Sequence, residues 1–236
     1  EREQQFASVG AAAVDARKEE GYKYPYTVGE TVHAWMPWVI LILCCALWGT
    51  PAWKTILVGG LNAGGKGYYA LDVTDPENPK GMWEFKWDPS VCPASVDLAT
   101  GNSADCHLGY TFGKPLITKI VDGITPGGKW VVMVTSGYNN VNSPGKSGDG
   151  QGYLYVLDAG NGQILYKIAT GAGDATTPSG LAQINNYVDK SDIDNLTVRV
   201  YGTDVLGNIW RFDVNDNLLP NGREAALVGT ATDSGG

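Results

Sequence analysis

The sequence predicts an all-β fold built from a repeated hairpin. Three segments share a β-branched run, a loop rich in glycine, asparagine or aspartate, and a strand that ends in Asp: ILVGGLNAGGKGYYALDV (56–73), VVMVTSGYNNVNSPGKSGDGQGYLYVLDA (131–159) and VRVYGTDVLGNIWRFDV (198–214). Glycine supplies 32 of the 236 residues, well above the usual share of about 7%. Irregularly spaced copies of one all-β unit are typical of a β-propeller, whose blades bury their faces against neighbouring blades.

The strands can be placed in order along the chain. Alternating apolar runs bounded by turn residues predict strands in three groups. The first group is Thr55–Gly59, Tyr68–Val73 and Met82–Trp87. The second is Pro115–Val121, Trp130–Ser136, Gly152–Ala159 and Ile164–Ala169, and the third is Leu181–Val188, Val198–Gly202, Asn208–Val214 and Ala225–Val228. The first group lacks an innermost strand, and the apolar run 38–43 stands where that strand belongs. We therefore expect 38–43 to add this strand or to pack over the blade. The prediction is a partial propeller of about three four-stranded antiparallel blades.

The chain divides near residue 50, giving a segment 1–50 of uncertain origin and a propeller segment 51–236. The first is expected to be helical or irregular, with a helix possible over residues 11–20. Its run 34–48, AWMPWVILILCCALW, is shorter than the roughly 20 residues of a membrane-spanning helix, and Pro37 interrupts its start. Three interpretations of this run remain open: half of a membrane span, a buried helix or a buried strand. We do not expect the run to insert into a membrane. Residues 20–54 also resemble a segment of an L-lactate permease.

The three aspartates that end the repeated strands have a structural explanation. Asp72, Asp158 and Asp213 each follow an apolar strand and precede a turn. Aspartate carboxylates accept hydrogen bonds from backbone amides two residues further on. The repetition of this position in every copy favours turn-forming residues over ligands.

Charge and motifs argue against several functions. The net charge of −8 argues against a nucleic-acid-binding protein, which needs a basic surface. The two histidines, His33 and His107, lie in different segments, and no His/Cys/Asp cluster has the spacing of a zinc site. No nucleophile stands beside a recognisable base motif. We therefore expect no catalytic residues and no enzymatic activity.

Cysteines and one acidic loop supply the candidate site residues. Cys92 and Cys106 flank CPASVDLATGNSADC, a spacing that suits a disulfide closing a surface loop; two free thiols are the alternative. A disulfide here indicates an extracytoplasmic protein. The other two cysteines, Cys44 and Cys45, are expected to stay unpaired. Asp189, Asp192 and Asp194 form part of an oxygen-rich calcium pattern, but no glycine follows, and a solvated polar turn is the favoured interpretation.

Residues 52–216 resemble a known family. GGLNAGGKGYYALDVTDPENP, LGYTFGKPLI, WVVMVTSGYNN, GYLYVLDAGNGQI and VYGTDVLGNIWRFDV are similar, in this order, to the C-terminal propeller of PilC/PilY proteins, adhesins and assembly factors at the tip of type IV pili. The resemblance implies a role in pilus biogenesis and adhesion, possible calcium, pilins or minor pilins and surface ligands as partners, and a location at the outer membrane or pilus surface. Binding is expected through loops Asn139–Gly152 and Cys92–Cys106. One alternative is a quinone-dependent dehydrogenase, because YVLDAGNGQIL is similar to a PQQ-type propeller repeat. The other is a fusion or fragment that carries part of a lactate permease membrane segment, from the resemblance of residues 20–54.

Overall fold

A computed structural model describes residues 27–49, 54–92, 100–141, 148–215 and 223–231. By its internal contacts the chain forms two units, Glu1–Trp53 and Lys54–Gly236. In the first unit the described residues form helix α2 (Val28–Gly49). The helix expected over residues 11–20 lies outside the described residues.

The second unit holds three four-stranded sheets. The first sheet contains β1 (Ile56–Gly60), β2 (Gly67–Asp72), β3 (Lys80–Trp87) and β4 (Ala104–Asp105). The second contains β5 (Leu116–Ile120), β6 (Lys129–Thr135), β7 (Tyr153–Asp158) and β8 (Ile164–Ala169). The third contains β9 (Gln183–Val188), β10 (Thr197–Thr203), β11 (Asn208–Asp213) and β12 (Ala225–Thr230). In the second and third sheets the strands lie in chain order, each antiparallel to the next. This arrangement is that of propeller blades, and the predicted strands of these two blades are confirmed.

The run 38–43 does not form a strand, so the innermost strand expected there is wrong, and a helix, which the sequence also left open, forms instead. Packing of this run over the blade stays a prediction. The run lies inside α2, with Pro37 also within the helix. Leucine, alanine and methionine around it favour a helix, and one apolar run fits either structure when its periodicity is uninformative. Large apolar side chains of α2 are exposed, including Trp35 and Ile42 at 65% and 66%. In the part of the chain that the structure describes, no helix combines the length and apolar character that a membrane crossing requires.

The fourth strand of the first sheet comes from a different place than expected. It is β4, which pairs with β3, so that β1 remains at the opposite edge. The pairing is parallel and short, joining Lys86 to Ala104 and Trp87 to Asp105. The strand therefore brings the end of the Cys92–Cys106 loop to the outer edge of the first sheet.

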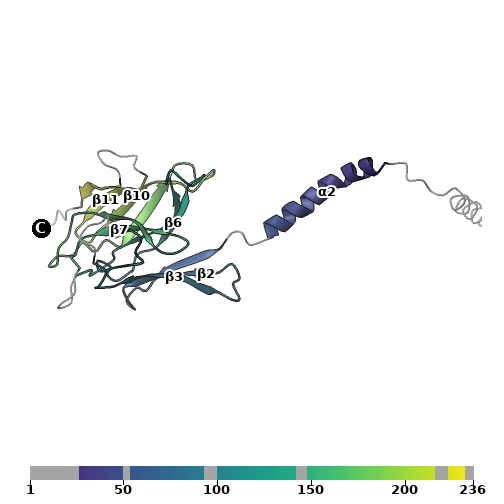
Figure 1. Ribbon diagram of the computed structural model, residues 1–236. Helices are drawn as coiled ribbons and strands as arrows, with labels where there is room; N and C mark the ends of the chain where they lie inside the picture. The colour runs from purple at the N-terminus through teal and green to yellow at the C-terminus, as the bar shows by residue number, and fades with distance from the viewer. Residues whose placement is uncertain (1–26, 50–53, 93–99, 142–147, 216–222, 232–236) are drawn as a thin grey trace, which may run out of the picture. The chain divides into compact units, whose positions relative to one another are not determined.

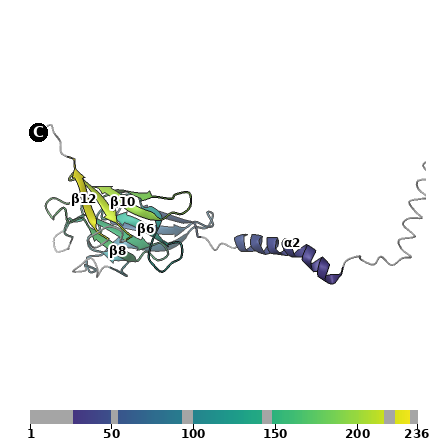
Figure 2. The same ribbon diagram turned by 90° about the horizontal axis from the view of Figure 1, so that it is seen from above.

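The second sheet lies between the other two, and the alternation of its side chains explains why. One core cluster, shared with the first sheet, contains Val132, Val134, Tyr155 and Leu157. The other cluster, shared with the third sheet, contains Val131, Met133, Leu154 and Val156. A strand with a period of two that is apolar on both faces must be covered on both. Figure 1 shows β6 and β7 between β2–β3 and β10–β11, and Figure 2 shows the view from above.

The aspartates that end the hairpins form turns, as the repetition predicts. Oδ1 of Asp72, Asp158 and Asp213 accepts a hydrogen bond from the backbone N–H two residues further on, at 3.0, 2.8 and 3.1 Å. Two of these carboxylates also face lysines: Asp72 lies 3.7 Å from Lys54, and Asp158 lies 2.8 Å from Lys129. The three equivalent residues thus carry the same structural role in each sheet.

Candidate functional site

The two loops expected to bind partners meet at one place in the fold. We call this surface the loop platform; its described residues are Cys92 with residues 100–107, and residues 139–141 with 148–152. Residues 93–99 and 142–147 lie outside the described residues. The Asn140 side-chain amide joins the two loops, because its Nδ2 donates to the carbonyl oxygens of His107 (3.1 Å) and Gln151 (2.6 Å).

Glycines let the platform backbones approach closely. A Cβ on Gly148 would lie 2.3 Å from the backbone oxygen of Asn140, closer than real Cβ contacts. Gly150 has a φ of +79°, and a Cβ there would lie 1.9 Å from the backbone oxygen of Asp174. Only glycine adopts such a conformation without steric cost. The glycine-rich GDGQG sequence therefore allows this loop to lie against the backbones of Asn140 and Asp174.

Beneath the platform lies a buried ionic cluster. Lys167 Nζ, from β8, donates to both carboxylate oxygens of Asp105, in β4, at 2.9 and 3.1 Å. The side chains are 2% and 0% exposed. The ammonium also lies 4.2 Å from the ring centre of Tyr153, an attractive cation–π contact. The pair therefore fastens the loop that ends at β4 to the second sheet.

His107 connects this pair to the surface. Its Nδ1 lies 2.8 Å from both Asp105 Oδ1 and Lys167 Nζ. A single ring nitrogen can donate to the first or accept from the second, but not both at once. On the other side of the ring, Nε2 lies 3.7 Å from Asp149 Oδ2. The imidazole, 12% exposed, thus bridges a buried carboxylate and one at the rim.

Burial and hydrogen bonding perturb the pKa values in this cluster. Burial alone raises the pKa of Asp105, but the hydrogen bond from His107 and the charge of Lys167 outweigh it and leave that pKa below its ordinary value. Burial lowers the pKa of Lys167, against the attraction of Asp105. The contact of Nζ with both oxygens supports the charged pair. Burial, together with the 2.5 Å hydrogen bond that Tyr153 donates to Asp149, raises the pKa of Tyr153 well above its usual value.

A disulfide closes the first platform loop. Cys92 and Cys106 are bonded, with their Cα atoms 5.0 Å apart. Cys106 is buried and lies directly before His107 in the chain. Its Sγ lies 3.3 Å from the Nδ1 atom of that histidine. The disulfide is therefore part of the wall around the ionic cluster.

Replacing both bonded cysteines with alanine is expected to lower the free energy of unfolding by about 3 kcal/mol. The bond links residues separated by 14 positions, and closing a loop of this length removes that much entropy from the unfolded chain. Urea unfolding of Cys92→Ala/Cys106→Ala against wild type measures it. Cys44→Ala/Cys45→Ala serves as control, with no comparable loss. Equal unfolding midpoints for wild type and the first variant would contradict a stabilising crosslink.

The acidic loop after β9 shows local roles for two of its carboxylates. Asp194 Oδ1 accepts from the Leu196 amide at 3.1 Å, and Asp189 Oδ1 accepts from the Tyr187 hydroxyl at 3.3 Å. Asp192 is exposed. Among the described residues, the group of three or more acidic, Cys or His side chains with converging ligand atoms is Cys92, Cys106 and His107. Calcium binding at Asp189, Asp192 and Asp194 stays a prediction.

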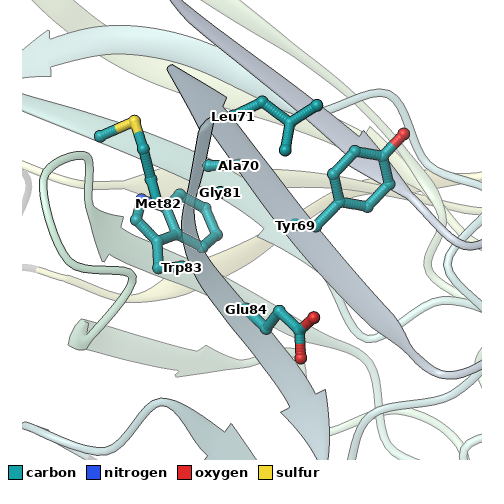
Figure 3. Close-up of a pocket in the computed structure, with 7 residues that line it drawn as sticks. All are labelled: Tyr69, Ala70, Leu71, Gly81, Met82, Trp83 and Glu84. Atoms are coloured by element: carbon teal, nitrogen blue, oxygen red, sulfur yellow. The ribbon is translucent and has the colours of Figure 1, made fainter. Parts of the chain in front are cut away.

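The first sheet also carries a hollow of about 370 Å³ on β2 and β3. Figure 3 shows its lining: Tyr69, Ala70, Leu71, Gly81, Met82, Trp83 and Glu84. It lies where the register of the two strands shifts, between Ala70 and Leu71. Glu84 is the one carboxylate among these lining residues. The lining therefore offers an apolar contact surface and no evident catalytic group.

Sequence reasoning identified both platform loops and the cysteines, but not the ionic cluster. Asp105 and His107 stand in a polar loop, and Lys167 stands 62 residues beyond Asp105. A charged residue inside the apolar strand ILYKIA is a signal for a buried partner, because lysine is almost never buried unpaired. The identity of that partner needs the fold.

The chain is similar to known proteins. Residues 44–228 match the family model described as the PilY1 β-propeller domain. The type IV pilus biogenesis factor PilY1 of Pseudomonas aeruginosa strain PAO1 is 33% identical over 163 residues, 69% of this chain and 12% of that protein. A PilY1 homolog of Xylella fastidiosa is 30% identical over 173 residues, covering 70% of this chain and 10% of the relative. The crystal structure of the P. aeruginosa PilY1 C-terminal domain shares 34% identity with a TM-score of 0.49, covering 68% of this chain and 27% of that one.

Proposed function

Because the chain belongs to the PilY1 β-propeller domain family, we propose that it serves as the propeller module of a type IV pilus biogenesis factor. The single observation that carries this proposal is the family match over residues 44–228. The relatives are named type IV pilus biogenesis factors, and this chain spans about a tenth of their length. The proposed location is extracytoplasmic, at the cell envelope or on the pilus. The proposed partners are pilins or minor pilins and surface ligands.

We further propose that the loop platform is the binding surface. Rigid elements that hold variable loops at the surface are the usual basis of recognition. Here the Asp105–Lys167 pair fastens the first loop to the second sheet, the disulfide closes that loop, and the amide of Asn140 joins it to the second loop. Tyr110 lies directly beside the platform, exposed by 36% and paired by its backbone with Tyr138. The Lys66 ammonium lies 5.7 Å from the ring of Tyr110, which gives the rim an aromatic and a cationic group.

The proposed role is binding without catalysis. Asp105, His107 and Lys167 are residue types that many active sites use, but here Asp105 and Lys167 are buried and neutralise each other. A general acid or base must reach the proton that it transfers. The burial of this pair therefore supports a structural role beneath the platform.

The test changes the platform surface without changing its supports. Ser103→Arg combined with Tyr110→Ser alters two exposed side chains and leaves the buried cluster intact. In a bacterium carrying the parent gene, we expect reduced surface piliation and twitching motility at an unchanged protein level. The control is Ile124→Ser, at a side chain 87% exposed in the β5–β6 connection, which is expected to change neither.

Two outcomes would contradict different parts of the proposal. Normal piliation and twitching with the platform variant would contradict binding through the loops. Normal piliation after deletion of the whole propeller segment would contradict the pilus role, because the resemblance would then mark only a shared fold.

A further inference from the structure

The three equivalent hairpins of the propeller segment differ at one edge. Aligned by the aspartate that ends each hairpin, β1–β2 corresponds to β6–β7 and to β10–β11. In the second and third sheets a further strand, β5 or β9, pairs antiparallel with the first strand of the hairpin. We call the place of β5 and β9 the inner-strand position. Among the described residues, β1 pairs with β2 alone, so β1 is an edge strand whereas β6 and β10 are internal.

The free edge of β1 presents the backbone groups of alternate residues. The Thr55 carbonyl oxygen, directly before β1, accepts from the backbone at the end of β2 at 2.8 Å. Because an antiparallel ladder alternates between bonded and non-bonded pairs, Ile56 and Val58 direct their N–H and C=O groups away from β2. The free stretch ends at Gly60, where a Cβ would lie 2.2 Å from the backbone oxygen of Thr111. Two successive outward-facing residues thus offer two donors and two acceptors.

An exposed side chain of β5 marks the same position. Between the second and third sheets the inner strands cover each other, because Asn186 Nδ2 of β9 donates to Thr118 Oγ1 of β5 at 3.4 Å. Ile117 is the residue of β5 equivalent to Asn186, and it pairs with Val132, which belongs to the core shared with the first sheet. Ile117 therefore faces the first sheet, and it is 40% exposed. A strand beside β1 would cover it as β5 covers Asn186.

The repeat also indicates which kind of strand the position accepts. In β5, every second side chain faces the next sheet: Ile120 belongs to the core shared with the third sheet, Leu116 packs against that core, and Thr118 is buried. A strand beside β1 would likewise run antiparallel to it and turn apolar or β-branched side chains toward Ile117. The residue opposite Ile56 must have a backbone N–H, which excludes proline.

We propose that the free edge of β1 accepts one extended segment of a partner polypeptide. The segment has the five-residue length of β5, alternates apolar or β-branched residues, and adds antiparallel to the first sheet at the inner-strand position. Strand addition is a common recognition mode, in which the main-chain hydrogen bonds give affinity and alternate side chains give specificity. The site lies on β1, outside the residues of the loop platform, and does not rest on the proposed pilus function.

The geometry favours a single segment over a second copy of the chain. In the second and third sheets the inner-strand position holds one strand, with no strand beyond it. A second copy that docked through its own β1 would bring β2 and β3 of its sheet to the same side, against the exposed face of β5. One extended segment fills the position without this crowding, as β5 and β9 do in their sheets.

The test uses the full chain and a synthetic peptide with the sequence of β5 and the next residue, LITKIV (116–121), capped at both ends and labelled with a fluorophore on a polar tail. Fluorescence anisotropy is expected to show saturable binding of one peptide per chain. Hydrogen exchange is expected to slow at the Ile56 and Val58 amides. A peptide with proline in place of threonine lacks the N–H opposite Ile56 and should bind at least about 10-fold more weakly, the effect of one lost hydrogen bond.

Two edge strands provide a matched pair of variants. Val58→Pro removes an N–H that faces away from β2, a place where a strand tolerates proline, and should weaken peptide binding at least about 10-fold. Leu227→Pro is the control on β12, the edge strand of the third sheet. The Asp213 amide donates to the Glu224 carbonyl, so by the same alternation the Leu227 N–H also faces away from its partner strand. This variant should bind the peptide as wild type does.

Three results would overturn the proposal. The first is unchanged exchange at Ile56 and Val58 in wild type with saturating peptide, a measurement that does not depend on how any variant folds. The second is equal affinity of wild type and Val58→Pro, with circular dichroism confirming that the variant keeps its strands. The third is a dimer in sedimentation without peptide that Val58→Pro dissociates, because a second copy would then occupy the edge.

Discussion

Replacing Asp105 with asparagine is expected to lower the free energy of unfolding by about 3–5 kcal/mol, the usual cost of removing one partner from a buried ion pair. The amide has almost the same shape as the carboxylate, so packing changes little. The loss comes from the Lys167 ammonium, which stays 2% exposed and loses its counter-charge. Urea unfolding of the variant and wild type measures the difference.

A second variant separates the charge from the packing. Asp105→Asn/Lys167→Met removes both charges and is expected to recover much of the lost stability, because well-packed apolar replacements of buried pairs are often tolerated. Lys129→Met removes the cation of a surface pair with Asp158, whose side chains are 33% and 21% exposed; it should cost less than about 1 kcal/mol. Equal losses for Asp105→Asn and Lys129→Met would contradict a stabilising buried pair.

The same pair predicts a pH dependence. The folded pKa of Asp105 is lowered, so its contribution to stability is present above its unfolded pKa of about 3.9. That contribution is lost as the pH falls through the lower folded pKa, because the unfolded state then binds more protons. Acid destabilisation below about pH 4 should therefore be steeper in wild type than in the double variant.

The sequence was sufficient for the hairpins because their signals are local. Tyr155 and Leu157 face one core and Val156 the other, as a strand with a period of two requires when both faces are covered. The turn role of Asp158 follows from its own two-residue spacing to Gly160. Such features depend on neighbours in the chain, and this is why they could be derived before the fold was known.

Features that depend on distant parts of the chain could not be derived in this way. β4 is two residues long and pairs in parallel with β3, too short for any hydrophobic period. Asp105 and His107 meet Lys167 only because β4 and β8 are brought together by two separate sheets. The run 38–43 could not be assigned for a different reason, since a short apolar run without clear periodicity fits either a strand or a helix.

Cohesion between the first and second sheets should depend strongly on Trp83. This side chain, in β3, is 8% exposed, and its Nε1 donates to the Ala159 carbonyl oxygen at 3.0 Å. Its ring lies over Gly162, where a Cβ would come within 2.6 Å of it. Trp83→Ala is therefore expected to cost about 3–5 kcal/mol of unfolding free energy, the range for large aromatic side chains removed from a core.

A matched tryptophan makes this expectation specific. Trp130, in β6, is 42% exposed, with the Lys119 ammonium 5.1 Å from its ring, and Trp130→Ala should cost less than about 1 kcal/mol, as surface changes usually do. Trp83→Phe keeps an aromatic ring but leaves the Ala159 carbonyl without its donor, and should fall between the two. Urea unfolding of the three variants gives the order. If Trp83→Ala cost no more than Trp130→Ala, the first sheet would be held to the second by the remaining core contacts and by the β4 loop, and not by this indole.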